Sequence, residues 1–156
     1  FLLSCSNHQN STPTIEENQV GIIKGDDFRS KAMMKFTDAY VNNDLNSVSN
    51  LFTDDAKIMV NDADLTFSEM AAGFSSGHNY FDNIRHEDRD AFTMHYKKGD
   101  IAGSIFTHYW YTWKATSKKT GEEISLRGYA WMKWRGDKVE ATYNAFDPSL
   151  YNAQLD

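Results

Sequence analysis

Three side chains in this sequence are candidates for moving a proton to or from a small molecule: His78, Tyr143 and Asp147. Histidine titrates near neutral pH, a carboxylate accepts protons and a phenol donates them, so these types together can serve general acid–base catalysis. His78 follows Phe74 by four residues, which places both side chains on one helical face. If the protein is an enzyme, we predict that these three residues carry out the proton transfer. The structural alternatives are a histidine at a fraying helix end and an aspartate that forms a turn before Pro148.

The other histidines have less informative surroundings. His86 lies in the charged run 85–89, RHEDR, which favours a solvated loop. His95 and His108 lie in segments of alternating polarity, and so on strands whose faces must be inferred. The sequence has no H-x-x-x-H spacing, no calcium-binding loop pattern, no cysteine pair and no glycine-rich phosphate motif. We therefore predict no metal site and no cofactor.

The elements that position these residues can be read from periodicity and turn signals. Asp26 or Asp27 can cap a first helix, and Thr66 with Glu69 has the spacing of a capping box. The pattern predicts, in order, a helix over 28–40, a short helix over 45–52, a turn over 53–55, a strand over 57–60, a helix from 66 to about 77, and strands over 92–96, 105–115, 124–134 and 139–146. The order of helices followed by an antiparallel meander predicts an α+β fold.

A tight hairpin at residues 136–137 sets the faces of the last two strands. It pairs Arg135 with Lys138, which places Ala130 opposite Tyr143 on the inner, apolar face. On the preceding strand, the same alternation turns Tyr109, Tyr111 and Trp113 inward, and it turns His108 and Trp110 outward beside Tyr129 and Trp131. Exposed aromatic residues in this number seldom stay uncovered, so we predict a homodimer through the outer sheet face. Stacking of a glycan on that face is the alternative.

Several phrases of the sequence resemble the NTF2-like superfamily, also called SnoaL-like or cystatin-like α+β cone proteins. The phrases are residues 36–45, the run 51–56 (LFTDDA) and the run 128–139 (GYAWMKWRGDKV), and the resemblance spans roughly residues 28–150. It implies a cone in which a curved antiparallel sheet wraps N-terminal helices and encloses a pocket. It does not imply one function, because isomerases, dehydratases, cyclases and non-catalytic binders share this fold.

Ketosteroid isomerisation is the best-understood chemistry on this fold, and its three polar positions are apolar here. Counting from the shared phrases, the base falls at Val60, the helix tyrosine near Phe36 and the protonated aspartate at Ala130. A slipped alignment would bring in Tyr40 or Asp62 instead. The resemblance implies a pocket lined by apolar and aromatic residues, for which we predict Phe36, Tyr40, Val60, Phe74, Tyr109, Trp113 and Ala130.

The N-terminus opens with an apolar stub, a small residue and Cys5, followed by a polar stretch. This order resembles the end of a bacterial lipoprotein signal peptide, in which the cysteine carries the lipid. We predict that residues 1–19 are a signal-peptide remnant and flexible tether, and that 20–156 form the NTF2-like domain. Lipidation of Cys5 would attach the protein to the cell envelope, in the periplasm or at the outer membrane of a Gram-negative bacterium. An ordinary terminus with a chance cysteine is the alternative.

The charge composition disfavours one further class of function. Sixteen basic and 22 acidic residues give a net charge of −6, which disfavours nucleic-acid binding. The first hypothesis is a non-catalytic cell-envelope module that binds a small apolar or amphipathic ligand. The second is a SnoaL-like dehydratase, cyclase or isomerase that uses His78, Tyr143 and Asp147. The third is a dimeric interaction domain whose core is filled.

Overall fold

A computed structural model describes residues 17–155 of the chain. Its elements are β1 (Gly21–Lys24), α1 (Phe28–Val41), the 3₁₀ helix η1 (Leu45–Leu51), β2 (Phe52–Val60), β3 (Ala63–Leu65), α2 (Phe67–Gly77), β4 (Phe81–Tyr96), β5 (Ile105–Ser117), β6 (Glu123–Arg135), β7 (Lys138–Phe146) and α3 (Ser149–Asn152). Cys5 and most of the predicted tether lie outside the described residues, so lipidation stays a prediction. Among residues 17–155, no helix is long and apolar enough to cross a membrane.

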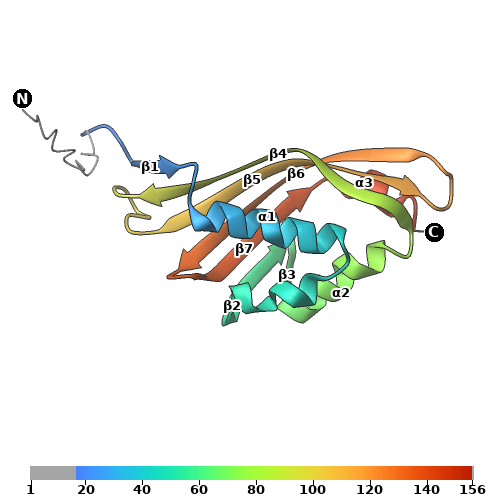
Figure 1. The fold of residues 1–156 in the computed structure, drawn as a ribbon, viewed down its shortest axis with the longest axis horizontal. Coiled ribbons are helices and arrows are strands. Elements are labelled where there is room, and N and C mark those ends of the chain that lie inside the picture. Colours follow the sequence, from blue (N-terminus) through green and yellow to red (C-terminus); the bar gives the residue numbers. More distant parts are fainter. Residues whose placement is uncertain (1–16, 156) are drawn as a thin grey trace, which may run out of the picture.

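One curved sheet carries the fold, with the strand order β1-β4-β5-β6-β7-β2-β3. The β2–β7 pair is parallel, and the other neighbouring pairs are antiparallel. Figure 1 shows α1 lying across one face of the strands, with α2 beside it. We call this covered face the inner face and the opposite one the outer face. The α+β cone predicted from the sequence is therefore confirmed.

Helix α1 begins at a buried N-cap. Asp27 accepts a hydrogen bond from the backbone N–H of Arg29 at 3.0 Å, as the sequence predicted. The second carboxylate oxygen of Asp27 lies 2.8 Å from His95 Nε2 on β4. The carboxylate is 6% exposed, so its partners replace the water it loses. Together these contacts fix the start of α1 against the end of β4.

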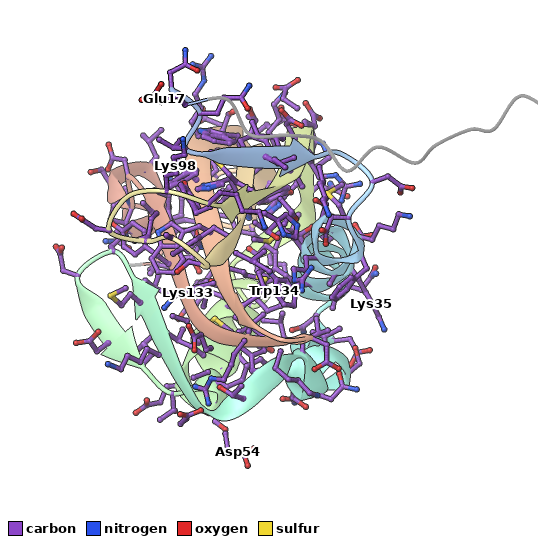
Figure 2. The ribbon with its side chains drawn as sticks, turned by 90° about the vertical axis from the view of Figure 1, so that its left-hand side faces the viewer. Glu17, Lys35, Asp54, Lys98, Lys133 and Trp134 are labelled. Carbon is purple, nitrogen blue, oxygen red and sulfur yellow. The ribbon has the colours of Figure 1, made fainter. Side chains whose placement is uncertain are left out.

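Buried hydroxyl groups also connect α1 to the strands of the sheet. The contacts run from Ser30 to Thr93 (2.9 Å), from Thr93 to Thr107 (2.8 Å), and from Trp134 Nε1, which donates to Thr107 Oγ1 at 2.9 Å. Figure 2 shows Trp134 within the molecule near α1, while Asp54 projects from its periphery. Because each of these polar groups has a partner, α1 is held in one position relative to β4, β5 and β6.

Helix α2 begins as the capping box predicted. Thr66 N donates to Glu69 Oε2 at 2.7 Å, and Glu69 N donates to Thr66 Oγ1 at 3.2 Å. The helix ends at Gly77, where a Cβ atom would lie 2.6 Å from the Tyr151 hydroxyl oxygen. A glycine at this position therefore allows α3 to pack against the end of α2.

The prediction from the sequence made strand β4 too short. The strand runs from Phe81 to Tyr96, whereas the prediction covered only residues 92–96 and assigned 85–89 to a loop. Two extra residues interrupt its pairing with β5, one between Asp82 and Arg85 and one between Glu87 and Asp90. Such bulges break the alternation of faces, so the period-two pattern that identifies a strand is lost there. Strand β2 was also underestimated, because it begins at Phe52 and includes the residues predicted as a turn.

The register of β7 corrects a second prediction. Arg135 pairs with Lys138 as predicted, but an irregularity follows at residues 139–141, and Ala130 pairs with Asn144 instead of Tyr143. One extra residue in β7 reverses which side chains face inward beyond it. Tyr143 consequently lies on the outer face, where its ring centroid is 6.1 Å from that of Trp131. On β5 and β6 the predicted faces are confirmed.

Candidate functional site

A cavity of about 280 Å³ lies between the inner face of the sheet and helices α1 and α2. Its walls are mainly aromatic and aliphatic, and all seven residues predicted to line a pocket do line it: Phe36, Tyr40, Val60, Phe74, Tyr109, Trp113 and Ala130. Glu69 and Gly73 also line it and are exposed, so the rim lies at α2. A volume near the low end of the usual ~300–1,000 Å³ suits a compact ligand.

The three residues predicted to be catalytic do not meet in this cavity. His78 is the C-cap of α2, and its Nε2 lies 3.1 Å from the backbone oxygen of Tyr40. Asp147 is exposed and accepts hydrogen bonds from the backbone N–H and hydroxyl of Ser149 at 2.9 and 2.6 Å. Tyr143 faces outward because of the β7 register. The structural alternatives for His78 and Asp147, a helix end and a turn, describe what is observed.

His86 is the histidine that reaches the cavity. Its ring stacks on that of Tyr111 at a centroid distance of 4.2 Å and an angle of 13°, and its Nδ1 lies 2.9 Å from the Tyr109 hydroxyl oxygen. The ring of Tyr40 lies 5.5 Å away on another side. Within residues 17–155, the other ring nitrogen, Nε2, has no hydrogen-bond partner and is not sealed from solvent. It is therefore available to a bound molecule.

The bulge between Glu87 and Asp90 explains why His86 points inward. Ala91 pairs with the inward-facing Tyr109, so an unbroken alternation would turn Glu87 inward and His86 outward. The extra residue reverses that parity, and His86 pairs instead with the inward-facing Trp113. Asp88 within the bulge has a φ of 48°, a conformation that aspartate tolerates better than most residues.

Burial controls the charge of His86. It lowers the pKa of the imidazole to about 4, with a smaller contribution in the same direction from the nearby Arg89 and an opposing one from Asp38. The ring is therefore uncharged at neutral pH and can accept a proton. An uncharged imidazole also carries only one N–H, so the hydrogen bond of Nδ1 determines what Nε2 can do.

Two phenols complete the polar part of the cavity wall. Tyr40 Oη accepts a hydrogen bond from Trp113 Nε1 at 2.7 Å, and Tyr111 donates to Asn144 Oδ1 at 2.8 Å. Burial raises the pKa of both Tyr40 and Tyr111 well above the usual value, so both keep their protons. The hydroxyl proton of Tyr111 is already donated in the hydrogen bond to Asn144. The Tyr40 proton has no acceptor in the described part of the chain and can be donated to a ligand.

Gly128 makes room for this arrangement. A Cβ atom at this position on β6 would lie 2.1 Å from Tyr111 Cζ and 2.3 Å from its hydroxyl oxygen. The Tyr111 ring thus lies directly over the glycine backbone, with the His86 ring on it at stacking distance. The absence of a side chain at residue 128 is what allows Tyr111 both to contact His86 and to reach Asn144.

The α+β cone with its aromatic-lined cavity is also found in solved structures of other proteins. No family model and no curated protein matches the sequence. A putative polyketide cyclase from Xanthomonas campestris matches with a TM-score of 0.62 and 13% identity, over 83% of this chain and 98% of that chain. A putative hydroxylase from Streptomyces galilaeus matches with a TM-score of 0.61 and 15% identity, over 82% and 95%.

A third match carries the name of the fold. It is an NTF2-like protein of unknown function from Burkholderia pseudomallei, with a TM-score of 0.57 and 11% identity over 80% of this chain and 95% of that chain. The chain therefore has the NTF2-like fold, as the resemblance in the sequence implied. At such low identities the likeness concerns the fold, and the function has to be argued from the cavity itself.

Proposed function

We propose that this protein binds a compact, largely apolar molecule that carries one polar oxygen. The observation that carries the proposal is the composition of the cavity wall, in which aromatic and aliphatic side chains surround a few polar groups with unused hydrogen-bonding capacity. Apolar walls stabilise the body of a ligand through burial, and few, fixed polar groups orient it. The groups with such capacity are Tyr40, through its proton, His86, through Nε2, and Asn144, through its Nδ2 amide.

Binding can be tested by reducing the cavity without touching its polar groups. Ala130→Leu adds three carbons on the inner face of β6, where residue 130 pairs with Tyr109 and Asn144. Ala145→Leu, on the outward-facing side of β7 opposite Tyr129, is the matched control. We would titrate each protein with β-tetralone, a bicyclic ketone, and measure binding by calorimetry, with thermal melting as the check on folding.

We expect the wild-type protein and Ala145→Leu to bind one β-tetralone with similar affinity. Ala130→Leu should weaken binding by at least about tenfold, because a ligand that fits the cavity then overlaps the added side chain. Equal binding by both variants would place the ligand elsewhere. No binding by the wild-type protein would contradict the proposal, and the cavity would then be only a packing feature of the core.

The comparisons support an enzyme of this fold class at least as well as a non-catalytic binder. Two of the solved structures described above are those of a putative polyketide cyclase and a putative hydroxylase. Ligand binding in the cavity is common to both interpretations. Catalysis requires in addition a reactive group beside the ligand, and His86 is the candidate that the geometry offers.

We also propose that two copies associate through the outer face. Aromatic rings form a continuous group on the outward side of β4, β5, β6 and β7: Phe92, Phe106, His108, Trp110, Tyr129, Trp131 and Tyr143. Trp110 is 44% exposed. Charged residues at the two ends of this face pair within the chain, as in Lys114 with Glu87 and Lys133 with Glu140. A second copy could therefore approach these two ends without bringing unpaired like charges together there.

A further inference from the structure

Glu69 is the one charged residue that lines the cavity in the part of the chain that the structure describes. Hydrogen bonds from Thr66 lower the pKa of its carboxyl group, so Glu69 is ionised at neutral pH. Among the described residues, no lysine and no arginine lines the cavity, and burial keeps His86 uncharged. The inside of the cavity is therefore neutral, and its rim carries a negative charge.

The Glu69 carboxylate has one oxygen available at this rim. Its Oε2 accepts hydrogen bonds from Thr66 N at 2.7 Å and from Thr66 Oγ1 at 2.8 Å, whereas its Oε1 has no partner within residues 17–155. Gly73 lies one turn further along the same face of α2, and a Cβ atom there would meet nothing within 4 Å. A group of a bound ligand can therefore reach Glu69 Oε1 through open space.

The segments that contribute this side of the cavity wall are acidic. Residues 59–80 cover the end of β2, β3 and α2, and residues 141–155 cover most of β7 and α3. Neither segment contains a lysine or an arginine. Besides Glu69 they contain Asp62, Asp64 and Asp147, which are exposed and form no ion pair with any described residue. These acids add to the negative potential around the rim.

A backbone contact brings two of these acids close to the cavity. Phe146 N donates to Asn61 Oδ1 at 3.0 Å, so the end of β7 lies against the turn that follows β2. Phe146 lines the cavity, and Asp62 and Asp147 are the residues that directly follow the two partners of this hydrogen bond. Their charges therefore lie next to the cavity wall.

The interior of the cavity also disfavours an anion. Tyr40 and Phe74 line it with ring centroids 5.5 Å apart, and the faces of aromatic rings attract cations. A carboxylate inside would lose its water without finding a positive partner. Lys118, which lies at the C-terminal end of α2, pairs with Asp82 at 3.4 Å. It is therefore already neutralised by a side chain of the protein.

We propose that the ligand of this cavity is an amine, whose cationic nitrogen lies at the rim beside Glu69 while its apolar body lies inside. This inference rests on the proposed function, because it requires a ligand in the cavity, and it adds the sign of the ligand's charge. At the rim the nitrogen keeps part of its hydration, so the attraction of Glu69 is not offset by a large desolvation cost.

The inner end of such a ligand is best a hydroxyl group. The uncharged His86 carries one N–H, so its Nε2 is either a donor or an acceptor, depending on the tautomer. A hydroxyl group can pair with Nε2 in both cases and can also accept the proton of Tyr40. Tyramine has a hydroxyl group at one end, an aromatic body and an ammonium group at the other end, and it is therefore the probe.

The experiment compares three phenols of different charge by calorimetry with the full protein at neutral pH. They are tyramine, which is cationic, 4-ethylphenol, which is neutral, and 4-hydroxyphenylacetate, which is anionic. Glu69→Gln is the test variant, because glutamine at this position can also complete the capping box with Thr66. Glu122→Gln is the matched control, since it makes the same change of charge at an exposed residue that does not line the cavity. Thermal melting checks that both variants fold.

We expect the wild-type protein and Glu122→Gln to bind tyramine about three- to fivefold more tightly than 4-ethylphenol, as one exposed ion pair allows. They should bind 4-hydroxyphenylacetate more weakly than either. In Glu69→Gln the preference for tyramine over 4-ethylphenol should fall below about twofold, while the affinity for 4-ethylphenol stays the same. Sodium chloride at about 0.5 M should reduce the preference of the wild-type protein, because it screens the charges.

The outcomes separate this inference from the proposed function. If 4-ethylphenol binds but tyramine binds no more tightly, or if Glu69→Gln keeps the full preference, the amine inference is wrong and the binding function stands. If Ala130→Leu binds tyramine as tightly as the wild-type protein does, the amine occupies the acidic surface instead of the cavity, which also overturns the inference. If neither the three phenols nor β-tetralone binds, the proposed function itself fails.

Discussion

Gly128→Ala is the substitution for which the structure gives the sharpest expectation. The added Cβ would lie 2.1 Å from Tyr111 Cζ, more than an ångström inside an ordinary contact of 3.4 Å. The ring cannot simply move away, because His86 stacks on it at a centroid distance of 4.2 Å and Asn144 accepts its hydroxyl proton at 2.8 Å. Tyr111 must therefore give up at least one of these contacts.

The expected cost follows from three contributions. Overpacking a close contact costs about 1–3 kcal/mol, and loss of the hydrogen bond between Tyr111 and Asn144 costs about 1 kcal/mol more. Replacing glycine in a strand returns about 0.5–1 kcal/mol, because the unfolded chain loses conformational freedom. We expect Gly128→Ala to lower the free energy of unfolding by about 2–3 kcal/mol, a shift of roughly 1 M in the urea midpoint.

A double-mutant cycle tests the cause directly. In a Tyr111→Ala background the clash is absent, so Gly128→Ala should be neutral or slightly stabilising, and the two positions should couple by about 2–3 kcal/mol. Urea unfolding followed by circular dichroism at 222 nm gives all four free energies. If Gly128→Ala costs nothing in the wild-type background, or the same in both backgrounds, the close approach of Tyr111 to residue 128 is not what the structure indicates.

Four further predictions use the same unfolding assay or sedimentation. Gly73→Ala should stabilise the protein by about 1 kcal/mol, since its Cβ would meet nothing within 4 Å and α2 gains a better helix former. Tyr40→Phe should destabilise it by about 1–3 kcal/mol, because Trp113 Nε1 loses its acceptor; an unchanged urea midpoint would contradict this. Between pH 6.5 and 4, His86 becomes protonated in the unfolded chain but stays uncharged in the folded protein. The free energy of unfolding should therefore decrease by about 3 kcal/mol as the pH falls through this range, and it should decrease less in His86→Asn. Trp110→Asp should convert the proposed dimer to a monomer by analytical ultracentrifugation, and a wild-type protein that already sediments as a monomer would refute the dimer.

The pocket wall could be predicted from the sequence because it depends on regular elements. Phe36, Tyr40 and Phe74 follow helical spacing, and Tyr109 and Trp113 follow the alternation of a strand that pairs with β6 without interruption. Wherever the period is regular, the face of a residue follows from its number. The resemblance to NTF2-like proteins supplied the remaining step, which is that helices and sheet enclose a space.

The catalytic candidates could not be predicted, because they depend on irregularities. One extra residue in β7 turned Tyr143 outward, and one in β4 turned His86 inward. The run RHEDR is polar because, on this bulged strand, only one of its side chains reaches the cavity. Asn83 and Asp88, both with positive φ, are the one available signal, since these residue types tolerate that conformation at bulges. In a single sequence that signal resembles an ordinary loop.

The positions of the polar groups in the cavity wall also restrict how a ligand can be oriented inside the cavity. The groups with unused hydrogen-bonding capacity are His86 on β4, Tyr40 on α1 and the Nδ2 amide of Asn144 on β7. Met59 and Val60 on β2 and Leu65 on β3 make the remaining wall apolar. Thr142, on the strand beside β2, donates its proton to the backbone of Trp131 and leaves no proton for a ligand. A molecule with one oxygen therefore gains a hydrogen bond only when that oxygen points towards His86, Tyr40 or Asn144, with its apolar body turned towards β3. In each of these orientations the apolar body lies against side chains that cannot compete for the oxygen, so the few polar groups alone decide how the ligand is oriented.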